Sequence, residues 1–198
     1  MTSRSDTVLT PERILDTAEE VLRRFGPAKA TVLDVARSLG VSHGSVYRHF
    51  PSKTALRDAV AERWLARVST PLAAIAAEDS PAPERLRQWL AQLGAEKRRM
   101  AREDPELFDT FHTIATQARE VVAEHLRILA AQITQIIESG VARKEFAPTD
   151  TAVAGRAVLQ ATARFHHPAH AVEWSDPSID ADYDAVVELV LRGLQACG

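Results

Sequence analysis

Apolar residues recur three or four positions apart along most of the chain, which is the spacing of one face of an α-helix. No stretch shows the alternation of apolar and polar residues that is typical of a half-buried strand. The first apolar stripe joins Ile14, Ala18, Val21, Leu22 and Phe25, and Gly26-Pro27 follows it as a helix stop. The pattern therefore predicts an all-α protein.

Similar stripes, bounded by capping residues, glycine or proline, predict the later helices. One helix begins near Ser52, and Pro71 inside its pattern predicts a kink or an end nearby. Further helices are expected at about residues 85–102, 105–112, 114–140, 150–167 and 180–195. The helix that Pro168 stops is rich in small residues, which let helix backbones approach one another closely.

Residues 31–53 contain two shorter stripes separated by a glycine. Thr31 can cap the first helix while Asp34 reaches back to the exposed amides, and Gly40 can end that helix in a left-handed conformation. Ser42 then caps a second helix. Two helices joined by a tight turn form a helix-turn-helix unit, whose second helix suits the major groove of DNA.

The charge distribution points to the same end of the chain. The net charge of −3, taken alone, argues against nucleic-acid binding. Residues 1–67, however, hold 11 Lys and Arg against 8 Asp and Glu, whereas residues 68–198 hold 13 against 19. No acidic residue lies between Val35 and Arg57. A basic head on an acidic body predicts a DNA footprint near the N-terminus.

The run GVSHGSVYRHFPSKTAL, residues 40–56, resembles the N-terminal helix-turn-helix of the TetR family of transcriptional regulators. The match rests on the small residue after Gly44, on Tyr47, and on the HF and SK pairs that follow. His43 departs from the pattern, since many members have lysine or another polar residue there. The resemblance covers about residues 10–57, and implies a three-helix DNA-binding head followed by a helical domain for ligand binding and dimerisation.

Phosphate contacts are expected from five residues of this head. The resemblance implies that Tyr47, His49 and Lys53 grip the DNA backbone. Thr31 and Ser42 lie at helix N-termini that face the same way.

Base reading is expected from the exposed face of the second helix. Ser45 and Arg48 lie on this face, and His43 and Gly44 lie at the end that would enter the groove. Arg48 is the best donor for a guanine edge.

By resemblance to the family, the second domain is expected to hold a small-molecule pocket. Large apolar side chains with a few polar ones suit such a pocket, although each candidate, taken singly, is more typical of an ordinary core. The candidates are Trp64, Trp89, Phe108, Phe111, His112, Phe165 and His166.

The resemblance also implies a homodimer in which the last two long helices of each subunit pair with their symmetry mates. Both helices have the apolar or small faces that this pairing needs, but an intrachain core could use the same faces. The residues expected at the interface are Val158, Val186, Val187, Val190, Leu191 and Leu194.

Two unusual segments of the second domain leave alternatives open. His166, His167 and His170 could bind a metal, but Pro168 breaks the helical geometry that would align them. Histidines that meet carbonyls or line a pocket are the preferred interpretation. The charged run 96–102 is interpreted as a solvated helix face, with a second DNA patch as the alternative.

No catalytic pattern stands out, since the chain lacks a glycine-rich phosphate loop and a nucleophile elbow, and its single cysteine, Cys197, has no neighbouring base in sequence. Without a disulfide framework or a membrane-length apolar run, we expect a cytoplasmic protein, and we expect no cofactor.

We therefore predict a DNA-binding domain over residues 1–52 and a ligand-binding and dimerisation domain over residues 53–198. The expected function is that of a ligand-responsive regulator, most simply a repressor, which binds a palindromic DNA operator as a homodimer and is released by a small molecule. The alternatives are a helical ligand-binding or metal-binding protein whose head has lost DNA binding and, third, an enzyme.

Overall fold

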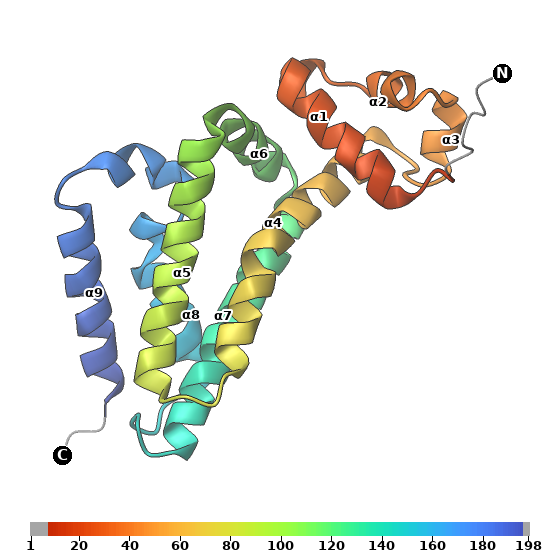
Figure 1. The fold of residues 1–198 in the computed structure, drawn as a ribbon. Coiled ribbons are helices and arrows are strands. Elements are labelled where there is room, and N and C mark those ends of the chain that lie inside the picture. The colour runs from red at the N-terminus through yellow and green to blue at the C-terminus, as the bar shows by residue number, and fades with distance from the viewer. Residues whose placement is uncertain (1–7, 196–198) are drawn as a thin grey trace. The chain divides into compact units, whose positions relative to one another are not determined.

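The computed structural model describes residues 8–195, and every regular element in that part of the chain is a helix (Figure 1). This confirms the predicted all-α class. The helices are α1 Pro11–Lys29, α2 Val32–Leu39, α3 His43–Tyr47, α4 Lys53–Ala77, α5 Ala82–Glu103, α6 Pro105–Gln117, α7 Arg119–Ala142, α8 Thr151–Ala161 and α9 Ile179–Leu194, with the short 3-10 helices η1 Ala163–Phe165 and η2 Pro168–Ser175 between the last two. None of the described helices is long and apolar enough to cross a membrane.

The chain divides into two compact units. The first unit runs to Trp64 and includes Glu106–Val121, and the second consists of Leu65–Pro105 and the chain from Val122 onward. The domain boundary expected near residue 52 therefore lies inside the first unit, because the opening turns of α4 belong to that unit together with α6.

In the first unit, α1, α2 and α3 lie side by side (Figure 1). Their apolar faces are buried. Ile14 of α1 and Val46 of α3 have no exposed surface, and Val35 of α2 is 3% exposed. Burial of each aliphatic side chain stabilises the fold by roughly 1.5–3 kcal/mol. α1 is interrupted at Gly26, whose φ of 71° costs glycine little, at the position where the sequence predicts a stop.

The opening turns of α4 are held within this unit by the ion pairs of one arginine and by a ring contact. Arg63 of α4 lies 2.7 Å from Asp16 and 2.6 Å from Glu19, both on α1. Trp64 stacks on Phe111 of α6, with ring centroids 4.8 Å apart. Both contacts join segments that are far apart in the sequence.

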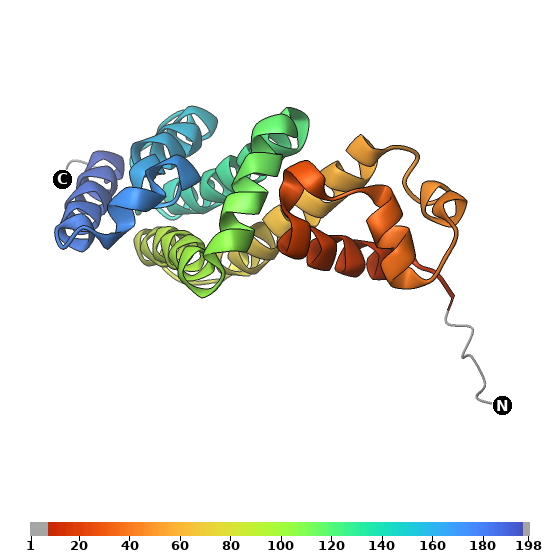
Figure 2. The same cartoon turned by 90° about the horizontal axis from the view of Figure 1, so that it is seen from above.

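The second unit is a helical bundle in which the later turns of α4 pack with α5, α7, α8 and α9 (Figures 1 and 2). Residues from all five helices share one buried core cluster. The core also contains a series of polar groups that are hydrogen-bonded to one another. Trp89 Nε1 donates to Gln132 Oε1 at 3.0 Å, and Gln132 Nε2 donates to Ser69 O at 3.0 Å. Buried polar groups that are paired in this way cost little stability.

Three predicted helix ends differ from the structure. Pro71 lies inside α4, which continues to Ala77, and Gly140 lies inside α7, which continues to Ala142. α8 ends at Ala161, well before Pro168. Here the Thr162 hydroxyl donates to the backbone oxygen of Val158 at 2.9 Å, so the side chain competes for a carbonyl at the helix end.

Candidate DNA-binding surface and effector cavity

Local caps set the direction of the candidate DNA-binding helix. Asp34 N donates to Thr31 Oγ1 at 3.2 Å, and Thr31 N donates to Asp34 Oδ2 at 3.0 Å, so the two residues form the expected capping box. Gly40 ends α2 with a φ of 67°. Ser42 Oγ accepts from Ser45 N at 3.1 Å and caps α3. These bonds start α3 directly after the turn.

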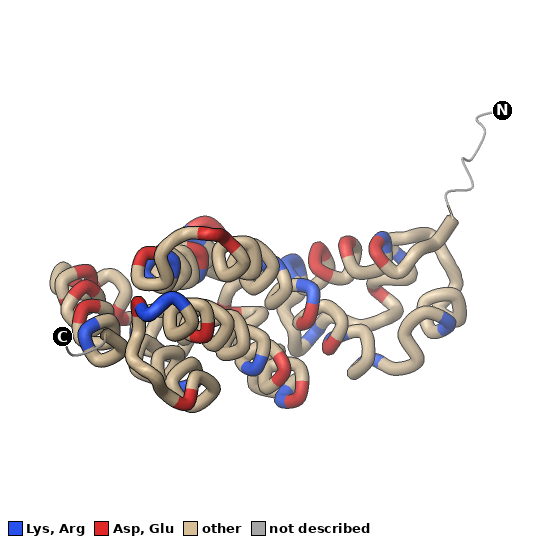
Figure 3. Tube along the Cα trace, turned by 90° about the horizontal axis from the view of Figure 1, so that it is seen from below, with Lys and Arg blue, Asp and Glu red and all other residues tan. Residues whose placement is uncertain are grey.

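The outer face of α3 offers hydrogen-bond donors with no carboxylate in its own segment. Of the nine expected DNA contacts, Ser45 and Tyr47 are half-buried, and the others are exposed. Residues 35–57 carry basic side chains and no acidic one (Figure 3). Arg48 donates to Ser45 Oγ at 3.4 Å, and the rings of His43 and Tyr47 meet edge-on at 4.5 Å. Such a face suits phosphates and base edges.

The seven expected pocket residues are divided between the two units. Trp64, Phe108, Phe111 and His112 belong to the first unit, and Trp89, Phe165 and His166 belong to the second. Five of the seven are apolar residues buried in the protein interior, and His112 is half-buried. His166 differs from the rest because it lines a cavity.

This cavity, of about 280 Å³, lies in the second unit between α7, α8 and the segment that follows α8. Its volume is close to the lower end of the roughly 300–1,000 Å³ that is usual for ligand pockets. The surface that faces the cavity is mostly apolar, although five of the nine lining residues are polar or basic, and none is acidic. The lining residues are Leu126, Arg127, Ala130, Arg156, Leu159, Gln160, Ala163, His166 and His167.

Four basic side chains are buried in the same unit. Arg85 of α5 is 3% exposed and donates to the backbone oxygens of Ala76 and Glu78. The other three lie near one another. Lys97 of α5 is 4% exposed, and His125 of α7 and His166 are each 7% exposed. Burial lowers the pKa of Lys97 to about 8. Burial, with a smaller contribution from the charge of Lys97, lowers the pKa of His125 to about 3 and that of His166 to about 4. At pH 7 both imidazoles are therefore neutral, and Lys97 carries the charge.

Burial of Lys97 corrects the interpretation of residues 96–102 as a solvated face. Arg99 and Arg102 are on the surface, where Arg99 pairs with Glu96 at 2.6 Å. Lys97, in contrast, continues the buried stripe of α5, because it follows Leu93 by four residues.

The three histidines near the end of α8 have separate partners. His166 Nε2 lies 3.3 Å from Leu159 O, and His167 caps η2 through its side chain. His170 Nδ1 lies 2.6 Å from Glu173 Oε1. Within residues 8–195, no group of three or more His, Cys, Asp or Glu side chains is arranged to hold a metal ion.

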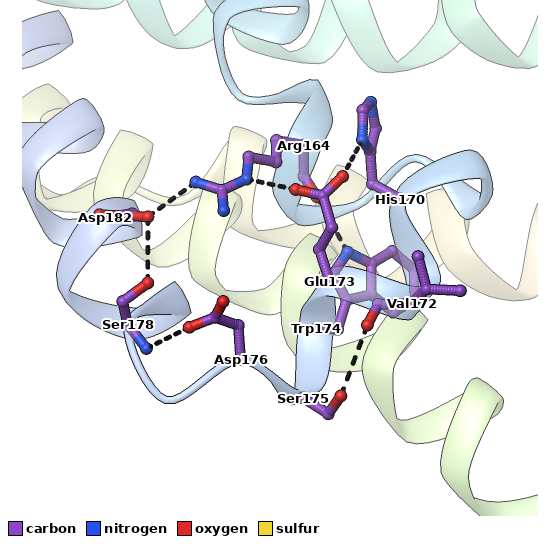
Figure 4. Close-up of polar contacts among 9 residues, drawn as sticks. All are labelled: Arg164, His170, Val172, Glu173, Trp174, Ser175, Asp176, Ser178 and Asp182. Carbon is purple, nitrogen blue, oxygen red and sulfur yellow. Dashed lines mark hydrogen bonds and ion pairs between the residues drawn. The ribbon is translucent and has the colours of Figure 1, made fainter.

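Arg164 organises the segment that carries these histidines (Figure 4). Its guanidinium donates to Glu173 and to Asp182 of α9, each at 2.7 Å. Its backbone oxygen accepts from Trp174 Nε1 at 2.9 Å. These bonds hold η2 between η1 and the start of α9.

Half of the residues expected at the dimer interface are buried in the core of their own chain. Val158 is 5% exposed, Val187 has no exposed surface and Leu191 is 3% exposed, because all three pack inside their own chain. Half-buried positions are occupied by Val186, Val190 and Leu194. The large apolar side chains that α8 and α9 expose are Val153 at 50% and Leu189 at 72%.

The sequence matches the profiles of two known protein-family domains. Residues 14–60 match the profile of the bacterial regulatory proteins of the tetR family, and residues 82–187 match a tetracyclin repressor-like C-terminal domain. The second match alone covers more than half of the chain. The chain belongs to the TetR family. Members of the TetR family are DNA-binding transcription regulators and not enzymes.

Relatives of this TetR-family chain include an uncharacterized HTH-type transcriptional regulator of Mycobacterium tuberculosis. The two are 29% identical over 133 residues, which is 67% of the chain and 64% of the relative, slightly less than two thirds of its length. Among solved structures, a TetR transcription regulator from Haloarcula marismortui has a TM-score of 0.71 at 19% identity, with 94% of this chain and 98% of that chain covered. This second likeness shows the fold.

Of the cavity lining, only His166 was expected from the sequence, and the buried Lys97 and His125 were not. Helical spacing gives a signal for these two. Lys97 lies on the stripe of α5 that contains Leu93, and His125 precedes Leu129 of α7 by four residues. The small residues Ala130 and Ala163 give no comparable signal, because their role depends on the space that neighbouring helices leave.

Proposed function

We propose that this TetR-family chain is a repressor that binds a palindromic DNA operator as a homodimer and releases it when a small molecule binds the second unit. The observation that carries the proposal is the exposed face of α3, which presents hydroxyl, imidazole and guanidinium groups within an acid-free segment. Each α3 would read one half-site, with half-site centres about 34–36 Å apart.

Ligand release is supported by the cavity of the second unit and by similar folds with bound molecules. FadR from Bacillus subtilis, solved with stearoyl-CoA, has a TM-score of 0.65 at 18% identity, covering 94% of this chain and 100% of that chain. SmeT, solved with triclosan, has a TM-score of 0.69 at 17% identity, covering 95% and 92%. A ligand that favours a conformation with the wrong half-site spacing would lower operator affinity.

Selection of genomic DNA fragments by the purified protein tests this proposal. The expected result is an enriched palindrome, bound by two chains. Lys53→Ala should weaken binding to all sequences alike and reduce the slope of log affinity against log salt by about one unit, because one phosphate contact is lost.

Arg102→Ala is the matched control, since it removes an exposed cation of the second unit. Its salt slope should equal that of the wild type. A selection without an enriched sequence, or a Lys53→Ala slope equal to the control, would contradict the proposal.

A further inference from the structure

We propose that the cavity between α7, α8 and η1 binds a small organic acid, with its carboxylate at His166 and its apolar body along Leu126, Ala130 and Leu159. The proposal gives the chemical class of the effector. It rests on the proposed function only for the claim that this binding changes operator occupancy.

The charges around the cavity favour an anion. Arg156 lies on its rim and has no ion-pair partner within the described chain. Arg127, also on the rim, pairs with Glu124, which does not line the cavity. From inside the bundle, the buried Lys97 adds a positive charge that acts on His166. The charge of Glu96 acts on Lys97, and Arg99 donates to that carboxylate at 3.0 Å. An anion therefore enters a positive potential.

His166 supplies a nitrogen for the carboxylate. Because a backbone oxygen can only accept, the contact of 3.3 Å between His166 Nε2 and Leu159 O places the imidazole proton on Nε2. Within residues 8–195 the ring contacts of His166, to Leu159 O and to Thr162 Oγ1, are made by Nε2, which leaves Nδ1 available to a ligand. An acid that enters with its proton transfers it to Nδ1, and an imidazolium–carboxylate pair forms. The charged groups that act on this pair are Lys97 of α5, Arg127 of α7 and Arg156 of α8, with the titratable His125 and His167 beside it.

The cavity limits the size of the acid. Its volume of about 280 Å³ equals roughly nine water molecules in the liquid. That space suits a medium-chain acid such as octanoate.

Isothermal titration of the full chain with octanoate and with octan-1-ol separates charge from apolar burial. Octanoate should bind at least tenfold more tightly than octan-1-ol. Its binding should also take up one proton near pH 7, which is measured as a binding heat that depends on the ionisation enthalpy of the buffer. Lys97→Met should weaken octanoate binding roughly tenfold and leave octan-1-ol binding unchanged, because it removes the buried charge that acts on His166. Arg102→Gln, on the exposed side of the same helix, should change neither affinity.

Ala163→Leu tests the location, because it fills the cavity from η1 and should abolish binding of both molecules. Thermal melts establish that each variant is folded. Equal affinity for the acid and the alcohol, no heat at millimolar octanoate, or unchanged binding by Ala163→Leu would each overturn the proposal. Hydrogen exchange that is slow across α7 and α8 without ligand, and unaffected by octanoate, would show that a partner subunit fills the cavity, and would also overturn it.

Operator binding is measured in parallel. Octanoate that binds and also releases DNA supports the effector role, and octanoate that binds without releasing DNA overturns that role while supporting the site. A chain that binds no DNA contradicts the proposed function, and the octanoate titration still decides on the cavity.

Discussion

At Lys97, the bundle buries a side chain whose charged form favours water. Its pKa is lowered from 10.5 to about 8, so the folded protein holds this proton less tightly than the unfolded chain does. Below pH 8 the charged amine is present in both states, and its burial lowers the free energy of unfolding. Between pH 8 and 10.5 the folded state loses the proton first, and the destabilisation disappears as the pH rises.

The free energy of unfolding of the wild type should therefore increase, relative to Lys97→Met, by about 1–3 kcal/mol between pH 8 and 10. Urea denaturation of both proteins at a series of pH values measures this difference. Tyrosine ionisation affects both proteins alike and cancels in the comparison. Parallel pH profiles would show that Lys97 is not charged at pH 8 or is not desolvated.

Arg48 carries the second prediction at the residue scale. It is exposed at the C-terminal end of α3, and the proposed DNA contact would place its guanidinium against a base edge. Arg48→Ala should relax the preference at one base pair of each half-site by roughly 1–3 kcal/mol. Binding of the wild type and of Arg48→Ala to a randomised operator library measures the base preference at each position. If every position keeps its preference, Arg48 contacts only phosphate.

Among the helices, the contact between α7 and α8 depends on one missing side chain. A Cβ atom at Gly155 would overlap Thr134 Oγ1 and lie 3.0 Å from Ala130 O. The small residues of α8 predict close packing, and the structure shows which of them is required. Ala130 also lines the cavity, so this contact sets the cavity wall.

Gly155→Ala should reduce the free energy of unfolding by about 1–3 kcal/mol, because the helices must move apart. Gly193→Ala in α9 is the control, since nothing lies within 4 Å of its added Cβ. The control should raise stability by up to about 1 kcal/mol through helix propensity. Urea denaturation measures the free energy of unfolding of both variants. Equal changes for Gly155→Ala and Gly193→Ala would show that α8 can shift to accept the added Cβ.

For the molecule as a whole, the proposed homodimer depends on the apolar side chains that α9 exposes. The buried Val187 and Leu191 are needed inside each chain, whereas Leu189 is 72% exposed on α9. A proposed homodimer in which α8 and α9 pair with their symmetry mates would cover Leu189. A mutation at this residue therefore tests assembly without disturbing the core.

Leu189→Glu should give folded monomers and lower operator affinity by orders of magnitude, because each head then binds alone. Val187→Glu should unfold the chain, since an isolated charge would be buried. Sedimentation and thermal melts distinguish the two results. A wild-type monomer at micromolar concentration that binds a palindrome tightly would disprove the dimer.

The sequence by itself determined the helix-turn-helix and its caps. Thr31 with Asp34, Gly40, and Ser42 with Ser45 act over three or four residues, so local composition predicts their geometry. The helical class follows equally from the spacing of apolar residues.

Only the tertiary structure decided what each apolar or buried face contacts. A stripe shows that a face of a helix is buried but does not identify its partner, so Val187 was open to both core and interface. For the same reason the cavity could not be predicted from the sequence, because it depends on how the helices pack. Gly155 lets α8 lie close to α7, and the helices leave a space beside His166. Such contacts join residues far apart in the chain, and their energies depend on how whole helices fit together.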